Sequence, residues 1–272
     1  MADRVSVVCR NATDASLPDR TLPLSPAQLG VYFEHLRDPV GNRFNIGQVT
    51  RIAGTLDVEV FRRAARDVIA STPALNMAIV VEDGEPRQRP VDRSDVDIPL
   101  YDLRDEQDTD AARSRLIDQL VYTPFDLARE PLVRWALVQT EEGAMDWTQV
   151  CHHVVVDAWS GQLLAGRVSA RYTELLSGNA SDVGAFEAYA KHVQSEIAYA
   201  NGVEVERDRS YWHDLLSGIE FATPFETQCL TDPALFGRPF LRHRVCLSGD
   251  DLAPVTALAK AHNVTSAHVV MG

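Results

Sequence analysis

Strand-like and helical segments follow one another along this chain without a strict strand–helix alternation. Apolar strand-like stretches are expected at residues 44–54, 75–81, 132–139, 147–155 and 242–247. Helical patterns begin near Ser25 and Asp57 and cover residues 109–121, 164–175, 183–200, 207–216 and 250–262. This mixture predicts an α+β layered fold in which helices cover a mixed or largely antiparallel sheet.

Composition narrows the class of protein. The chain has 272 residues, 45% of them hydrophobic and 24% charged, enough for one generous domain or two small ones. A formal net charge of −13 disfavours nucleic acid and anionic membranes as partners. Four scattered cysteines without a C-x-x-C pair, and no apolar run resembling a signal peptide, favour a reducing cytoplasmic location.

The residues most suggestive of chemistry are His152 and His153, which stand at the end of an apolar strand and four residues ahead of Asp157. Neighbouring side chains on a strand point to opposite faces, so one imidazole should face a cleft and the other the core. A neutral histidine could take a proton from an attacking amine or hydroxyl. The alternative is a core histidine beside a surface histidine. Zinc fits poorly, because two imidazoles on opposite faces of a strand cannot both bind one tetrahedral zinc ion.

Residues 152–160, His-His-Val-Val-Val-Asp-Ala-Trp-Ser, resemble the His-His-x-x-x-Asp-Gly-x-Ser signature of the condensation domains of nonribosomal peptide synthetases. Other segments agree in family order: Leu-Ser-Pro-Ala-Gln at 24–28, Phe-Asn-Ile at 44–46, Phe-Asp-Leu at 125–127 and Pro-Leu-Val-Arg at 131–134. Phe-Glu-Ala-Tyr-Ala at 186–190 and Tyr-Trp at 211–212 are similar to later motifs. The joint match is far more specific than one motif alone.

The resemblance implies a chloramphenicol-acetyltransferase-like fold, in which two lobes enclose a tunnel. It also implies acyl transfer: an amine on one carrier protein attacks an acyl or peptidyl thioester on another, forming an amide. Both substrates would be tethered by phosphopantetheine, and no metal or other directly bound cofactor is implied.

The resemblance also assigns roles to residues. His153 would be catalytic, His152 structural, and Asp157 structural and paired with an arginine. The N–H of Ala158 could bind the oxyanion, and Trp159 and Ser160 would border the substrate channel. From the residues alone, Asp157 could equally be a helix N-cap and Trp159 a core aromatic.

Two positions depart from the family pattern. Ala158 replaces the usual glycine, which adds a methyl group and disfavours positive φ. Residues 71–76, Ser-Thr-Pro-Ala-Leu-Asn, match the Arg-His-x-x-Leu-Arg segment only loosely and lack both arginines. The partner of Asp157 must therefore come from elsewhere, with Arg134 or Arg62 as the candidates. These changes leave open reduced activity, an unusual acceptor or a degenerate domain.

We expect residues 1–23 to be a leader or arm and residues 24–272 to be the amino-terminal lobe, truncated before the second lobe. The helix expected after Thr265 is cut off at Gly272, which favours a fragment, and the start at Met1 near the first motif favours a synthetase's first domain. Such a fragment should be inactive alone, needing the second lobe, carrier proteins and a following adenylation domain. The alternatives are a stand-alone acyltransferase of the superfamily and a degenerate, condensation-like docking platform.

Overall fold

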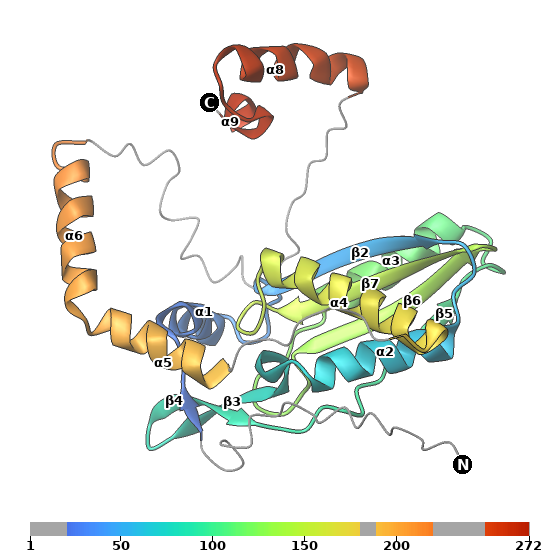
Figure 1. Cartoon of the computed structure of the whole chain (residues 1–272). Coiled ribbons are helices and arrows are strands. Elements are labelled where there is room, and N and C mark those ends of the chain that lie inside the picture. The colour runs from blue at the N-terminus through green and yellow to red at the C-terminus, as the bar shows by residue number, and fades with distance from the viewer. Residues whose placement is uncertain (1–20, 180–188, 220–247, 272) are drawn as a thin grey trace, which may run out of the picture. The chain divides into compact units, whose positions relative to one another are not determined.

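The structure is a computed structural model that describes residues 21–179, 189–219 and 248–271 (Figure 1). Contacts divide the chain into two compact units, Met1–Arg238 and Pro239–Gly272. The strands are β1 (Leu22–Pro23), β2 (Asn45–Ala53), β3 (Met77–Glu82), β4 (Glu85–Pro90), β5 (Leu100–Asp102), β6 (Val133–Glu141) and β7 (Ala144–His152). In its described part the first unit has the helices α1 (Pro26–Arg37), α2 (Val58–Ala70), the 3-10 helix η1 (Pro73–Asn76), α3 (Thr109–Tyr122), α4 (Ala158–Ser177), α5 (Tyr189–Ala200) and α6 (Val203–Leu216).

The strands form two sheets. The larger sheet has the order β2-β7-β6-β5, in which β2, β7 and β6 are antiparallel and β5 runs parallel to β6. The smaller sheet has the order β1-β4-β3 and is antiparallel throughout. Helices pack against the larger sheet, so the α+β layered fold expected from the sequence is confirmed.

Helices α2 and α3 lie on opposite faces of the larger sheet. Phe61 of α2 stacks edge-to-face on Trp147 of β7, with ring centroids 5.1 Å apart. Arg113 of α3 forms an ion pair with Asp146, the neighbouring residue on the same strand. Since successive strand side chains alternate between faces, these two contacts place the helices on different sides. Helix α4 packs beside α2 (Figure 1).

Local sequence signals account for most element boundaries. Ser25 and Gln28 form a capping box that begins α1, and the Asp57 carboxylate accepts the Glu59 and Val60 N–H groups at the start of α2. Gly178 ends α4 with a φ of 72°. The β3–β4 hairpin turns at Asp83 and Gly84, both with positive φ.

Two expected strand boundaries need correction, the end of the expected leader is paired in a sheet, and two expected segments lie outside the described residues. The strand expected at 75–81 begins only at Met77, because η1 occupies residues 73–76. The strand expected at 147–155 ends at His152. The end of the expected leader forms β1, in which Leu22 and Pro23 pair with β4. Residues 183–188 of one expected helix and the strand expected at 242–247 lie outside the described residues.

The second unit contains α8 (Gly249–Ala261) and α9 (Ser266–Met271) in its described part. Ser248 and Asp251 form the capping box that begins α8. The Thr265 hydroxyl accepts the His268 N–H, so this residue caps α9 as expected. None of the helices in the described residues is long and apolar enough to cross a membrane.

Candidate active site

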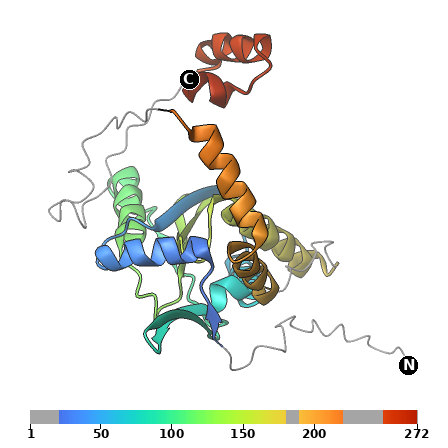
Figure 2. The same cartoon turned by 90° about the vertical axis from the view of Figure 1, so that its left-hand side faces the viewer.

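The His-His segment lies in a tight turn at the end of β7, between two neighbouring strands. The His152 N–H donates to the Leu132 carbonyl at 3.0 Å, and the His153 N–H donates to the Phe44 carbonyl at 2.7 Å. The chain then turns, and the Val155 N–H donates back to the His152 carbonyl at 3.1 Å. Figure 2 shows α1 crossing in front of these strand ends. The turn is therefore anchored on both sides before α4 begins.

His152 points into the core. Its side chain is buried, with the residue 1% exposed, and the His35 ring lies edge-on to it at 5.1 Å between centroids. Its Nδ1 accepts the Val154 N–H at 3.1 Å. Burial, together with the smaller effects of the nearby His35 and His153, lowers the pKa of His152 to about 3. The ring is therefore a neutral structural acceptor inside the turn.

His153 points away from the core and is exposed. Its Nδ1 lies 2.9 Å from the Val156 carbonyl oxygen. Because a carbonyl can only accept, the neutral ring carries its hydrogen on Nδ1. Nε2 then keeps its lone pair, as a general base requires. The expectation that one of the two histidines faces the core is confirmed for His152, while the expectation that the other faces a cleft stays a prediction.

Asp157 is the N-cap of α4. Its Oδ1 accepts the Ser160 backbone N–H at 2.7 Å and the Ser160 hydroxyl at 2.6 Å. These hydrogen bonds hold the pKa of the Asp157 carboxyl below its usual range. No arginine in the described part of the chain forms an ion pair with it. The N-cap alternative is therefore the one that the structure supports.

The suggested arginine partners are wrong. The Arg134 guanidinium donates to the carbonyls of Leu120, Thr123 and Pro124, and its Cζ lies 4.3 Å from the centroid of the Phe125 ring. Arg134 thus stabilises the C-terminal end of α3 instead of Asp157. Arg62 donates to the Ile98 carbonyl and pairs with Glu59.

The two departures from the family pattern have local structural explanations. Ala158 is the first residue of α4 and is absent from the described residues with positive φ, so its methyl group causes no backbone strain. Its N–H has no acceptor among the described residues. Asn76 donates to the carbonyls of Ile69, Ala70 and Thr72, which closes the C-terminal end of α2.

The first turn of α4 carries the two expected channel residues. Trp159 is 75% exposed, so the alternative of a core aromatic is wrong. The N–H and the hydroxyl of Ser160 both donate hydrogen bonds to Asp157. Cys151, one residue before the histidine pair, is buried, and burial raises the pKa of its thiol to about 12. It is therefore not a competing nucleophile.

The rings that enclose His152 were not predicted as its neighbours, although Phe44 and Phe125 stand in the Phe-Asn-Ile and Phe-Asp-Leu motifs. His35, Phe44 and Phe125 all place a ring within 6.1 Å of the His152 ring, counted between centroids. They come from α1, from the residue before β2 and from the loop before β6. A helical period could have shown that His35 lies on the inner face of α1, but not which buried ring it meets.

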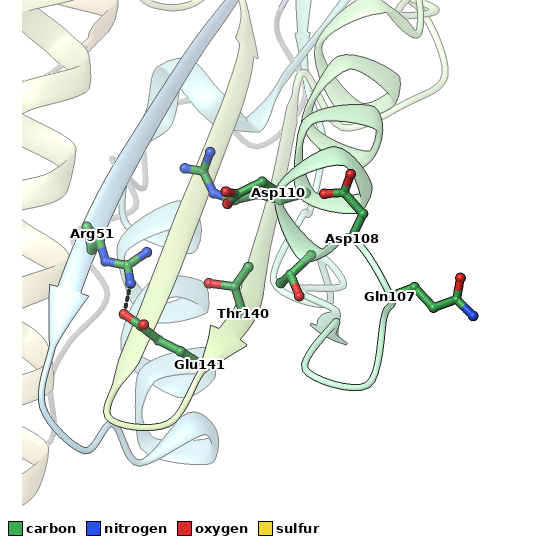
Figure 3. Close-up of a pocket in the computed structure, with 8 residues that line it drawn as sticks. Arg51, Gln107, Asp108, Asp110, Thr140 and Glu141 are labelled. Carbon is green, nitrogen blue, oxygen red and sulfur yellow. Dashed lines mark hydrogen bonds and ion pairs between the residues drawn. The ribbon is translucent and has the colours of Figure 1, made fainter.

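A polar pocket of about 710 Å³ lies at the other end of the larger sheet (Figure 3). Both arginines that line it are held in ion pairs: Arg51 bridges Glu141 and the buried Asp146, and Arg113 also pairs with Asp146. His152 and His153 do not line it. The pocket is therefore an ion-pair network separate from the histidine turn.

Comparison with known families decides what this arrangement belongs to. A sequence model described as the condensation domain matches residues 19–271. The chain belongs to the condensation-domain family. It is 32% identical over 251 residues to the isonitrile lipopeptide synthase of Streptomyces coeruleorubidus, a match that covers 92% of this chain and 17% of that protein. The dimodular nonribosomal peptide synthase of Bacillus subtilis (strain 168) is 28% identical over 244 residues, which cover 89% of this chain and 10% of that protein.

Solved condensation domains have the same fold. The first condensation domain of the CDA synthetase matches with a TM-score of 0.78 and 25% identity, over 93% of this chain and 60% of that one. A mutant of the starter condensation domain of rhizomide synthetase RzmA, in complex with C8-CoA, matches with a TM-score of 0.70 and 26% identity, over 77% and 48%. The condensation-domain chain thus spans about half the length of these structures and less than a fifth of the two synthases.

Proposed function

We propose that this chain supplies the amino-terminal lobe of a condensation domain that forms an amide bond between two carrier-bound substrates. The donor would be an acyl or peptidyl thioester and the acceptor an amine, each tethered by phosphopantetheine. The observation that carries the proposal is the exposed His153 ring, whose Nδ1 is engaged by the Val156 carbonyl at 2.9 Å and whose Nε2 is left basic.

In the proposed reaction, the acceptor nitrogen attacks the thioester carbonyl carbon while Nε2 of His153 takes one of its protons. The carbonyl oxygen becomes an oxyanion, for which the Ala158 N–H at the start of α4 is a donor without another acceptor among the described residues. Collapse breaks the carbon–sulfur bond, and the imidazolium returns its proton to the departing thiolate. The products are an amide and a free thiol.

His152 and Asp157 would hold the turn and the start of α4 in place and would not contact the substrate. His152 fills the core beneath the turn and accepts the Val154 N–H, while Asp157 begins the helix that presents Ala158. Trp159, which is 75% exposed in the same first turn, would border the path of the substrate.

A second lobe is part of the proposal. The chain covers 48% and 60% of the two solved condensation domains. Three large side chains of α6, Tyr211, Trp212 and Leu215, are 61%, 56% and 52% exposed, an apolar surface of the kind that usually meets another protein element. We expect residues 1–272 alone to form no amide. Carrier proteins and a following adenylation domain are the proposed partners of the complete protein.

The test uses the complete protein with one donor-loaded and one acceptor-loaded carrier protein, and mass spectrometry of the acceptor-bound product. His153→Ala should lower the rate of amide formation by about 10²–10⁴-fold, the usual contribution of a general base. His192→Ala is the matched control, since His192 is an exposed histidine on α5 outside the turn. It should keep the wild-type rate.

Two outcomes would overturn the proposal. Unchanged product formation by His153→Ala would favour a docking platform, which needs no base. Product formation from a free acyl-CoA, but not from a loaded carrier, would favour a stand-alone acyltransferase.

A further inference from the structure

A partly buried polar cluster contacts the histidine turn and joins segments that are distant in the sequence. It consists of the side chains of Gln28 in α1, Gln88 in β4 and Tyr189 in α5. Gln88 is 0% exposed, and burial raises the pKa of the Tyr189 hydroxyl. Figure 1 shows α1, α5 and β4 gathered on one side of the first unit.

Gln28 is the member of the cluster that reaches the turn. Its Nε2 lies 2.9 Å from the carbonyl oxygen of Val154, the residue that follows His153. The same nitrogen lies 3.1 Å from Gln88 Oε1 and 3.0 Å from the Tyr189 hydroxyl. Because an amide nitrogen has two hydrogens, one serves Val154 and the other is shared within the cluster.

The Gln28 amide is itself held in one orientation. Its Oε1 accepts the Ser25 N–H at 3.0 Å and the Gln88 Nε2 at 3.0 Å, so the oxygen and the nitrogen cannot exchange places. Gln88 is fixed in turn, because its Nε2 donates to the Pro23 carbonyl at 2.9 Å and its Oε1 accepts the Tyr189 hydroxyl at 2.6 Å. A buried network with all members satisfied is rigid.

We infer that Gln28 is a positioning residue for His153, acting through the Val154 carbonyl. The turn has its own internal bonds, from Val154 N–H to His152 Nδ1 and from His153 Nδ1 to Val156 O. Within the described residues, Gln28 supplies the side-chain donor that ties this turn to α1 and the smaller sheet. Loss of that tether lets the turn shift, and a misplacement of about 1 Å can lower a catalytic rate by about 10²-fold.

Gln28→Glu separates the hydrogen bonds that the Gln28 amide nitrogen donates from the role of the residue in the capping box. A glutamate has the same shape and is itself a standard third residue of a capping box, so it can still accept the Ser25 N–H and keep the start of α1. As a carboxylate it has no hydrogen to donate to the Val154 carbonyl, and it also loses the hydrogen bonds of Nε2 to Gln88 Oε1 and the Tyr189 hydroxyl. The variant therefore removes the tether and spares the cap.

The experiment compares Gln28→Glu with Asp108→Ala in the complete protein with loaded carriers. Asp108 is the N-cap of α3, where it accepts the Ala111 N–H at 2.9 Å, and it does not contact the turn. We expect Gln28→Glu to lower kcat by at least about tenfold with little change in KM, since the tether does not touch substrate. Asp108→Ala should keep kcat.

A second measurement does not depend on activity. Amide hydrogen exchange of a peptide spanning residues 150–158 should be faster in Gln28→Glu and unchanged in Asp108→Ala. Tyr189→Phe, which removes one contact of Gln28 and leaves the bond to Val154, should show a smaller change of the same sign. Tyr189→Phe also provides the test of the tether if Gln28→Glu does not fold.

The inference rests on the proposed role of His153, and the two can fail separately. Full activity in His153→Ala would reject that role, while the exchange measurement would still report on the tether. Full kcat and unchanged exchange in Gln28→Glu, beside an inactive His153→Ala, would overturn the inference alone. Equal kcat losses in Gln28→Glu and Asp108→Ala would also overturn it, because a general loss of stability would then explain both.

Discussion

Mild acid should destabilise this lobe through the buried ring of His152. The pKa of His152 is lowered to about 3 in the folded chain, first by burial and then by His35 and His153. In the unfolded chain a histidine has a pKa of about 6.5. Between these values the unfolded chain binds a proton that the folded chain does not. The free energy of unfolding therefore falls as pH drops below about 6.5, and it continues to fall toward pH 3.

The magnitude follows from the two pKa values. The slope approaches one proton, or about 1.4 kcal/mol per pH unit. Integrated from pH 7.5 to pH 5.0, the loss from His152 is about 2 kcal/mol. That is a large part of a typical total stability of about 5–15 kcal/mol. Burial also lowers the pKa of His35, so the neighbouring ring adds a loss of the same sign.

His152→Asn isolates the contribution of this ring. The asparagine oxygen can replace Nδ1 as the acceptor of the Val154 N–H, but the side chain does not titrate. Urea unfolding at pH 7.5 and pH 5.0 can be followed by tryptophan emission, since Trp135 and Trp147 are buried in β6 and β7. The wild type should lose about 2 kcal/mol more than the variant between the two pH values.

Subtracting the variant from the wild type removes the carboxylates and the exposed histidines, which titrate in both. Equal losses in the two proteins would refute the reasoning, because they would mean that His152 binds its proton as readily in the folded chain as in the unfolded one.

Three further substitutions test the local assignments. Asp157→Ala should lower the free energy of unfolding, measured by thermal denaturation, by about 1 kcal/mol, and Asp157→Asn by much less, since asparagine also caps helices. A large loss in Asp157→Asn would indicate a missed ion pair. Arg134→Met should lower the free energy of unfolding, measured in urea, by about 2–3 kcal/mol, because three carbonyls and the Phe125 ring lose their cation. An unchanged free energy of unfolding would show that water replaces these hydrogen bonds. Ala158→Gly should change kcat of the complete protein by less than about threefold, since the alanine already has an ordinary helical φ; a large gain would show that its methyl group obstructs the substrate.

The amino-acid sequence was enough to predict the layered α+β fold and most element starts. Ser25, Asp57 and Thr265 were expected to begin helices, and each does. Such boundaries follow from hydrogen bonds between residues three or four apart, which a local pattern contains. The motifs in their family order were likewise enough to predict the condensation domain that the comparisons confirm.

The outcome was different wherever a partner is distant in the chain. Asp157 was expected to pair with an arginine, yet it caps α4, and Arg134 instead binds the C-terminal end of α3. The strand expected at 147–155 ends at His152, because the last hydrogen bonds to the neighbouring strands are those of the His152 and His153 N–H groups to Leu132 and Phe44, and the chain then turns.

The tertiary structure also decided what surrounds the histidine turn. Gln28 and His35 meet this turn from α1, more than a hundred residues earlier in the chain. The spacing of residues along a helix or strand determines which face a side chain occupies. Which group it meets there depends on how the layers pack, and that is fixed by the burial of many distant side chains together.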